Sequence, residues 1–263
     1  MSRDFADWLA LREPADVAAR AAELIEPLRR HLATDGPAVI HDLGAGTGSM
    51  GRWLAPRLPE RQHWVLYDRD EDLLARANAG GGPVSVETRQ WDITRLTAAD
   101  LDGAALVTAS ALLDMFTARE VERVVAACAG AGCLALLTIS VTGRVELTPA
   151  DPLDAEIMAA FNDHQRRTVG GRRLLGPDAV GVAVAAFRRR GIPVIARSSP
   201  WRLGARDGDL IVEWLAGWVG AACEQRPELA GPAAEYAGRR REEALAGQLS
   251  VVVHHTDVLA NCR

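Results

Sequence analysis

The stretch V39-I-H-D-L-G-A-G-T-G-S-M-G51 decides how the first half of this chain is interpreted. It places four glycines, at positions 44, 46, 48 and 51, directly after a short apolar run. Two patterns overlap in it. Read from Gly46, G-T-G-S-M-G matches GxGxxG, and read from Asp42, D-L-G-A-G-T-G is an acidic residue followed by GxGxG. Both are typical of a strand that ends in a glycine-rich turn, where the backbone approaches a ligand closely.

Apolar runs and helical patterns alternate along the chain around this stretch. An apolar stripe predicts a helix over 14–32. The runs that follow are mostly apolar without alternation, which is typical of parallel strands buried on both faces. Short connections and right-handed crossovers then favour a doubly wound α/β sheet. Strands are expected at 38–43, 64–68, 84–89, 104–109 and 133–141, with helices between them.

The alternation of strands and helices becomes less regular beyond residue 141. The uncharged run over 124–141 is long enough to suggest a membrane span. Gly130 and Gly132 interrupt it, so the end of a helix and a buried strand are expected instead. Further along, a polar segment is expected at 142–176, helices at 178–190, 209–224 and 233–247, and strands at 194–197 and 250–255.

Length, charge and residue content limit the kinds of partner and site that the chain is expected to have. A length of 263 residues fits one elaborated domain. The net charge of −5, without a long run of Lys or Arg, argues against a nucleic-acid partner. The N-terminus lacks the basic and apolar regions of a signal peptide, so a cytoplasmic protein without a membrane partner is expected. No metal site is expected, because His254 and His255 are neighbours on a strand and face opposite sides.

Three acidic residues follow the first three strands. At the end of the first, the Asp42 carboxylate would repel a pyrophosphate, whereas it suits the ammonium and sulfonium groups of S-adenosylmethionine. Asp68 ends the second strand and can accept hydrogen bonds from ribose hydroxyls, which both ligand classes require. Asp92 follows the third strand and can accept one from an adenine amino group. Each of them could instead cap a helix or a turn.

The ordered set resembles the class I S-adenosylmethionine-dependent methyltransferases over residues 38–141. It comprises Asp42 to Gly48, the strand-end Asp68, Q90-W-D-I93 and V107-T-A-S-A-L-L-D114. The resemblance implies a doubly wound, mainly parallel seven-stranded sheet of order 3-2-1-4-5-7-6, with the last strand antiparallel at 250–255. It also implies helical additions at the N-terminus and after strand six.

The resemblance further implies a domain layout and residue roles. A helical cap over 1–36 would precede an S-adenosylmethionine-binding domain over 37–263, with acceptor-side insertions near 142–176 and 200–247. Asp68 would hold the ribose with Arg69 beside it, and Ser110 would lie under the sulfonium. Asp92 and Ile93 would bind the adenine, and the methionine half would contact Asp42, Gly44, Ala45, Gly46 and Gly48.

The acceptor is expected to be a small molecule methylated on an O, N or C atom. The chain lacks the Asn/Asp-Pro-Pro-Tyr/Phe loop and the Pro-Cys pair of enzymes that methylate nucleic-acid bases. The most polar stretch after the fifth strand is F161-N-D-H-Q-R-R167. His164 in it could act as a base, since imidazole titrates near neutral pH, and Asn162 could orient the acceptor. A solvated helix end explains the same residues equally well.

Two other functions remain open on sequence grounds. An NAD(P)-dependent oxidoreductase would use the overlapping GxGxxG that begins at Gly46. A non-catalytic protein would bind S-adenosylmethionine without transferring its methyl group.

Overall fold

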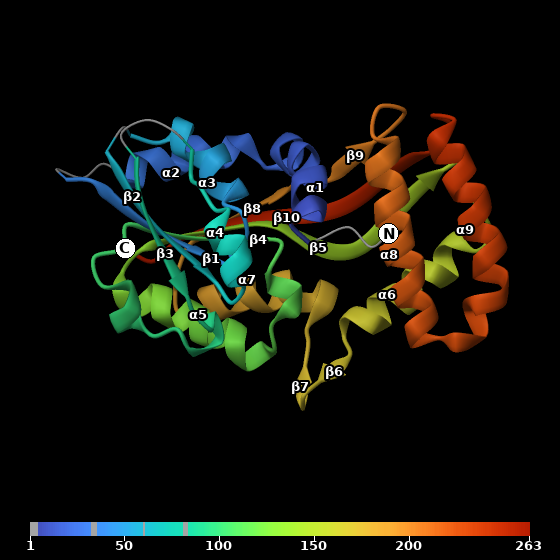
Figure 1. The fold of residues 1–263 in the computed structure, drawn as a ribbon. Helices are drawn as coiled ribbons and strands as arrows, with labels where there is room; N and C mark the ends of the chain where they lie inside the picture. Colours follow the sequence, from blue (N-terminus) through green and yellow to red (C-terminus); the bar gives the residue numbers. More distant parts are fainter. Residues whose placement is uncertain (1–4, 33–35, 60, 81–83) are drawn as a thin grey trace.

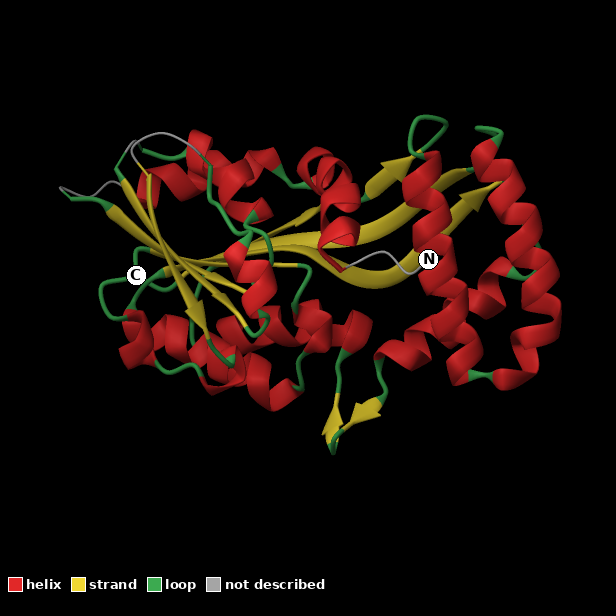
Figure 2. Cartoon of the chain, in the orientation of Figure 1, coloured by secondary structure: helices red, strands yellow, loops and turns green. Residues whose placement is uncertain are grey.

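A central mixed sheet with helices on both faces makes up the larger part of the computed structural model (Figure 1). The structure describes residues 5–32, 36–59, 61–80 and 84–263. Two long strands leave one side of the sheet and run into a lobe of helices (Figure 2). In spatial order, the strands of the main path are β3 (Val84–Gln90), β2 (Gln62–Asp68), β1 (Ala38–Leu43), β4 (Leu106–Ser110), β5 (Leu134–Thr148), β10 (Ser250–Asn261) and β8 (Val194–Ser198).

This strand order confirms the predicted fold class. On the main path β8 is the sixth strand and β10 the seventh in chain order, so the observed order is 3-2-1-4-5-7-6. The first five strands pair in parallel, and β10 runs antiparallel to β5 and β8. One strand more than expected is present, because β9 (Trp201–Leu203) also pairs with β10. Parallel pairing brings the carboxyl ends of β1, β2 and β4 to one edge.

Helices cover each face of the sheet over a separate apolar core. One core lies under α2 (Ile25–Leu32) and α3 (Ser49–Leu54), and Trp64 is fully buried in it. The other lies under α5 (Ala118–Ala131) and α7 (Ala179–Arg189), and Phe187 is fully buried in it. The uncharged run over 124–141 divides into a helix end and a strand, as the sequence predicts, because α5 ends at Ala131 and β5 begins at Leu134. None of the helices in the described residues is both long and apolar enough to cross a membrane.

The single N-terminal helix expected over 14–32 is wrong. The structure has α1 (Phe5–Ala19), a break, a short 3-10 turn and then α2. At the break Ala21 is extended, with φ −69° and ψ 92°. Its N–H donates to the buried Asp257 carboxylate over 2.8 Å, so a side chain on β10 takes the hydrogen bond that would have continued the helix. Arg20 is thereby left at the end of α1.

The strands β5 and β10 are longer than expected and support the helical lobe. Their antiparallel pairing continues to Thr148 and Ser250, well past residue 141. In this extension exposed residues of β5 alternate with half-buried residues and the buried Leu147, a pattern without the continuous apolar character of the inner strands. A third apolar core lies between the extension and three helices. These helices are α6 (Asp154–Gln165), α8 (Gly208–Gln225) and α9 (Ala230–Leu245).

Candidate cofactor site

A cavity of about 360 Å³ lies at the carboxyl ends of β1, β2 and β4. Its walls come from α1, the glycine loop, the ends of β2 and β3, and the segment after β4. This volume is in the range of small-molecule sites. Two of the residues predicted to bind a cofactor, Gly48 and Asp92, are outside its lining. The others line it together, namely Asp42, Gly44, Ala45, Gly46, Asp68, Arg69, Ile93 and Ser110.

The glycines of the loop have two different structural roles. Gly44 and Gly46 line the cavity with φ of +65° and +54°, a region that favours glycine. Gly48 has φ +86°, and a Cβ there would lie 2.1 Å from the carbonyl oxygen of Asn78. A Cβ on Gly51 would lie 2.6 Å from that of Ala79. Gly48 and Gly51 therefore pack the loop against its neighbour, while Gly44 and Gly46 line the cavity.

Asp42 presents a buried carboxylate with one unpaired oxygen. Its side chain is 1 % exposed, and Oδ1 accepts a hydrogen bond from the Thr108 hydroxyl over 2.6 Å. Within the described residues Oδ2 has no partner. Burial raises the pKa of Asp42 to about 7, against the hydrogen bond from Thr108 and the positive charge of Arg20. Asp42 caps no helix, so the capping alternative does not account for it.

Arg20, which is not among the residues predicted from the sequence, brings a buried positive charge to the same wall. Its guanidinium donates to the hydroxyls of Ser49 and Ser110 over 3.3 and 3.2 Å, and Nε has no partner in the described chain. Burial lowers the pKa of Arg20 from its ordinary value, and nearby carboxylates including Asp42 oppose this. An arginine stays charged under such conditions. Asp42 and Arg20 thus bring a carboxylate and a guanidinium to the lining of the same cavity.

Asp68 joins the glycine loop to the end of β2. Its Oδ2 accepts from the backbone N–H of Gly46 over 2.9 Å, and its Oδ1 from that of Asp70 over 3.1 Å. The helix α4 (Glu71–Ala75) is capped by Asp70 and not by Asp68. Both oxygens of Asp68 keep a lone pair for a ligand, since each accepts one of these bonds.

Asp92 is engaged in a turn beside the cavity. Its carboxylate accepts from the backbone N–H and the hydroxyl of Thr94, and Arg69 donates to it over 3.0 Å. The hydrogen bond from Thr94 lowers the pKa of Asp92. For this residue the capping alternative describes what is seen. The neighbouring side chains Trp91 and Ile93 line the cavity.

The structure does not bring His164 and Asn162 to the cavity lining. Both lie on α6 in the helical lobe. The imidazole Nε2 of His164 contacts the Glu224 carboxylate over 3.1 Å, and Arg167 approaches Nδ1 at 3.3 Å. Asn162 donates to the carbonyl of Gly143 over 2.7 Å. Their polar partners are groups of the lobe itself, so a base and an orienting amide gain no support from this geometry.

Apolar side chains line the part of the cavity between α1 and the segment after β4. The residues concerned are Phe5, Leu9, Leu112, Met115 and Phe116. Two polar contacts hold α1 over them: Glu13 binds Arg52 of α3 over 2.8 Å, and the indole N–H of Trp201 donates to Asp16 over 2.9 Å. The cavity therefore has a charged end at the glycine loop and an apolar end under α1.

Comparison with known proteins supports the predicted family. A family model described as "Methyltransferase domain" matches residues 40–131, which confirms the predicted class I methyltransferase for that segment. No curated protein sequence matches the chain.

Solved structures resemble the chain in fold. The apo form of the mycolic acid cyclopropane synthase CmaA1 is 12% identical with a TM-score of 0.50, covering 99% of this chain and 100% of that one. The cyclopropane synthase MmaA2 from Mycobacterium tuberculosis is 13% identical, with a TM-score of 0.49 and coverage of 90% and 83%. An O-methyltransferase family protein from Burkholderia thailandensis is 22% identical, with a TM-score of 0.46 and coverage of 73% and 55%.

Proposed function

Because residues 40–131 form a class I methyltransferase domain, we propose that this chain transfers a methyl group from S-adenosylmethionine to a small-molecule acceptor. When bound, S-adenosylmethionine supplies an electrophilic methyl group on a sulfonium. The residues of the chain have to hold it in one orientation, exclude water and align the acceptor. Orientation of this kind contributes roughly 7–11 kcal/mol in well-aligned reactions.

One observation carries the proposal: the cavity wall combines a buried carboxylate and a buried guanidinium that each keep an unpaired atom. These atoms are Oδ2 of Asp42 and Nε of Arg20. A buried polar group without a partner is costly, so a ligand that supplies the partner gains affinity. The amino-acid end of S-adenosylmethionine carries both an ammonium and a carboxylate and satisfies the pair. A pyrophosphate would instead meet the carboxylates of Asp42 and Asp68.

The remaining parts of the cofactor fit the next residues along the cavity. Asp68 holds the two ribose hydroxyls on its free lone pairs, and Trp91 and Ile93 provide apolar surface for the adenine. Asp92 already accepts from Thr94 and Arg69, so we assign it the role of fixing the turn that presents those two side chains.

The acceptor enters at the apolar end of the cavity. Ser110 marks the boundary, because its hydroxyl accepts from Arg20 while the next residues of the segment are apolar. In this proposal residues 1–36, of which the structure describes 5–32 and 36, form a cap whose helix α1 excludes water. The insertions near 142–176 and 200–247 form the lobe on the acceptor side. An acceptor with an apolar body matches the side chains there.

Ligand titration and product detection test this function together. The purified protein is titrated calorimetrically with S-adenosylhomocysteine and, separately, with NAD and NADP. It is then incubated with methyl-labelled S-adenosylmethionine and a pool of small metabolites. We expect saturable binding of S-adenosylhomocysteine alone and a labelled product. Binding of a nicotinamide dinucleotide alone would point to the oxidoreductase, and binding without any product to a non-catalytic protein.

Arg57 provides the matched control for Arg20, because both guanidinium groups lie over the ring of Trp53. The distance to the ring centroid is 5.4 Å for Arg20 and 5.2 Å for Arg57. Of these two arginines, Arg20 lines the cavity and Arg57 does not. Arg20→Gln should abolish the labelled product, whereas Arg57→Gln removes the same charge from the same ring and should leave the product unchanged.

A further inference from the structure

A second groove, of about 730 Å³, lies beside the cofactor cavity and is rich in arginine. Its walls are the start of α5 and the hairpin of β6 (Thr168–Val169) and β7 (Arg172–Arg173), which projects from the body of the molecule in Figure 1. The arginines that line it are Arg119, Arg123, Arg166, Arg172 and Arg173.

Some of these arginines are already bound within the protein. Arg166 contacts Asp178 over 2.6 Å and Arg172 contacts Glu120 over 2.7 Å, each through two hydrogen bonds. The guanidinium of Arg123 donates to the carbonyl of Thr94. These contacts fix the two walls relative to each other, because Arg172 belongs to the hairpin and Glu120 to α5.

Two arginines have no such partner. Arg119 on α5 and Arg173 on the hairpin are exposed, and neither side chain makes a hydrogen bond or ion pair within the described residues. Asp178 and Glu120 are the acidic side chains in the lining, against five arginines. The groove therefore carries an excess of positive charge with two free guanidinium groups, an arrangement that suits a phosphate because a guanidinium can donate two parallel hydrogen bonds to it.

The groove shares a wall with the cofactor cavity. Arg172 lines both, and its guanidinium also donates to the backbone carbonyl of Met115, over 3.1 Å. The Met115 side chain lines the apolar end of the cofactor cavity. The two hollows are therefore adjacent at Arg172, and a molecule that spanned both would place one part in each.

We propose that this groove binds a phosphate group of the methyl acceptor, through Arg119 and Arg173. The acceptor is then an amphipathic small molecule, with an apolar part under α1 and a phosphate or diphosphate in the groove. That the bound molecule is a methyl acceptor rests on the proposed methyl transfer. Anion binding by the groove can be tested without it.

Inorganic pyrophosphate is the probe, titrated calorimetrically into the full chain at low ionic strength, where charge interactions are least screened. The titration is repeated with saturating S-adenosylhomocysteine. We expect saturable binding in both cases, because the groove is separate from the charged end of the cofactor cavity. The doubly substituted Arg119→Gln, Arg173→Gln protein should bind pyrophosphate on the order of 100-fold more weakly, since two charge-assisted contacts are lost.

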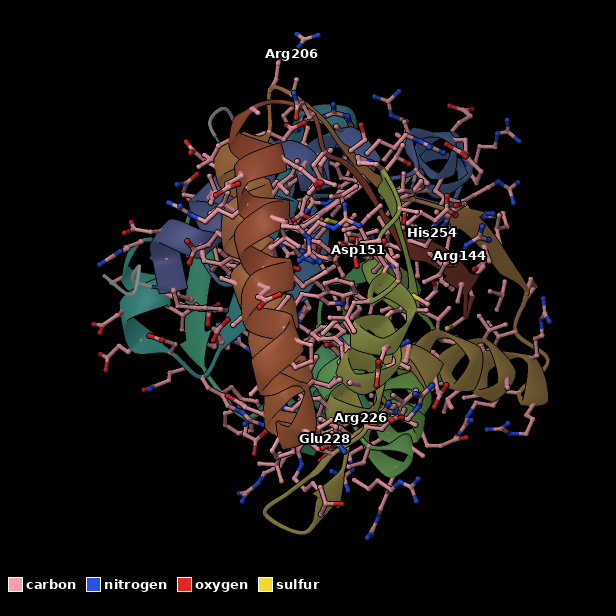
Figure 3. The ribbon with its side chains drawn as sticks, turned by 90° about the vertical axis from the view of Figure 1, so that its right-hand side faces the viewer. Arg144, Asp151, Arg206, Arg226, Glu228 and His254 are labelled. Atoms are coloured by element: carbon pink, nitrogen blue, oxygen red, sulfur yellow. The ribbon has the colours of Figure 1, made fainter. Side chains whose placement is uncertain are left out.

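The control changes the same charge elsewhere. Arg188 on α7 and Arg206 before α8 also lack ion pairs in the described chain, and Figure 3 shows Arg206 at the end of the molecule opposite the hairpin. Arg188→Gln, Arg206→Gln should bind pyrophosphate as the unaltered protein does. Circular dichroism establishes that both variants fold.

The outcomes separate this inference from the proposed function. No binding of pyrophosphate, or equal loss in both double variants, would overturn the groove whatever S-adenosylhomocysteine does. Competition between pyrophosphate and S-adenosylhomocysteine would place the anion at Arg20 and overturn it as well. Absence of S-adenosylhomocysteine binding with pyrophosphate binding intact would instead count against the cofactor site and leave the anion groove standing.

Discussion

Replacing Asp42 by Asn removes one negative charge from the cavity while keeping the shape of the side chain. The amide oxygen can still accept from Thr108, so the fold should persist. A hydrogen bond to a charged group contributes about 1.5–3 kcal/mol, and about 1.4 kcal/mol corresponds to a factor of ten. We therefore expect Asp42→Asn to weaken S-adenosylhomocysteine binding by about 10- to 150-fold at pH 8.

The pH dependence adds a second signature. Burial raises the pKa of Asp42 to about 7 in the ligand-free protein, so at pH 6 about a tenth of this carboxyl is ionised. A ligand ammonium selects the ionised form. The affinity of the unaltered protein for S-adenosylhomocysteine should then rise roughly tenfold from pH 6 to pH 8, and that of Asp42→Asn should stay nearly flat.

Whereas the affinity should rise with pH, the contribution of Asp42 to the stability of the ligand-free protein should fall as the pH rises. The pKa of Asp42 is raised from an ordinary value of 3.8, so the folded state favours the protonated carboxyl. The corresponding stability is present below pH 4 and is lost as the pH rises through 7. A shift of this size corresponds to roughly 4 kcal/mol at about 1.36 kcal/mol per unit. Asp42→Asn should raise the melting temperature of the ligand-free protein at pH 8 and change it much less at pH 5.

Calorimetric titration at pH 6, 7 and 8, with thermal unfolding of the ligand-free protein at pH 5 and 8, checks these values. An Asp42→Asn protein that binds S-adenosylhomocysteine as tightly as the unaltered chain would refute the reasoning. So would tighter binding of NAD(P) by the variant, because removal of a negative charge favours a pyrophosphate in the dinucleotide register of the loop.

Three further changes have defined outcomes. Arg20→Gln should weaken S-adenosylhomocysteine at least tenfold by calorimetry, because it removes a charged hydrogen-bond donor from the cavity; unchanged affinity would contradict its role. His164→Ala should alter turnover by no more than about twofold, because the ring binds Glu224 outside the cavity, and a large loss that shrinks at high pH would restore it as a base. Gly48→Ala should lower the melting temperature sharply because its Cβ meets backbone, whereas Gly217→Ala, with open space on a helix, should stabilise by about 0.5–1 kcal/mol; equal effects would contradict the packing role of Gly48.

The parts of the site that the sequence predicted are those whose pattern is local. Asp42 and Gly44 to Gly48 are one strand end and one turn, and Asp68 ends the next strand of a parallel pair. Their spacing alone implies that they meet at one edge of the sheet. Asp92 shows the limit of such reasoning, because a residue beside a cavity and a residue that caps a turn have the same sequence pattern.

Arg20 shows which part of the site depends on tertiary structure. Its position depends on the break after α1, and the break depends on Asp257, which lies 236 residues away from Ala21. A signal existed in retrospect. The cavity-lining positions of the N-terminal helix form one stripe at helical spacing, in which charged residues continue the apolar ones: Phe5, Leu9, Arg12, Asp16 and Arg20.

The helical lobe was anticipated only as a group of helices. The extension of β5 carries alternating exposed residues, and such a stretch does not reveal its partner strand until β10 is known to pair with it. The sequence favours an acceptor-side position for His164 because its segment is polar and follows the fifth strand. A polar stretch does not specify which way a helix turns its side chains, and α6 directs this ring to Glu224.

A crystal structure of the complex with S-adenosylhomocysteine tests the central claim most directly. We expect the ligand in the cavity under α1, with its carboxylate on the guanidinium of Arg20, its ammonium on Oδ2 of Asp42, and both ribose hydroxyls on Asp68. A ligand bound away from the glycine loop, or one whose amino-acid end lies apart from Asp42 and Arg20, would contradict the account.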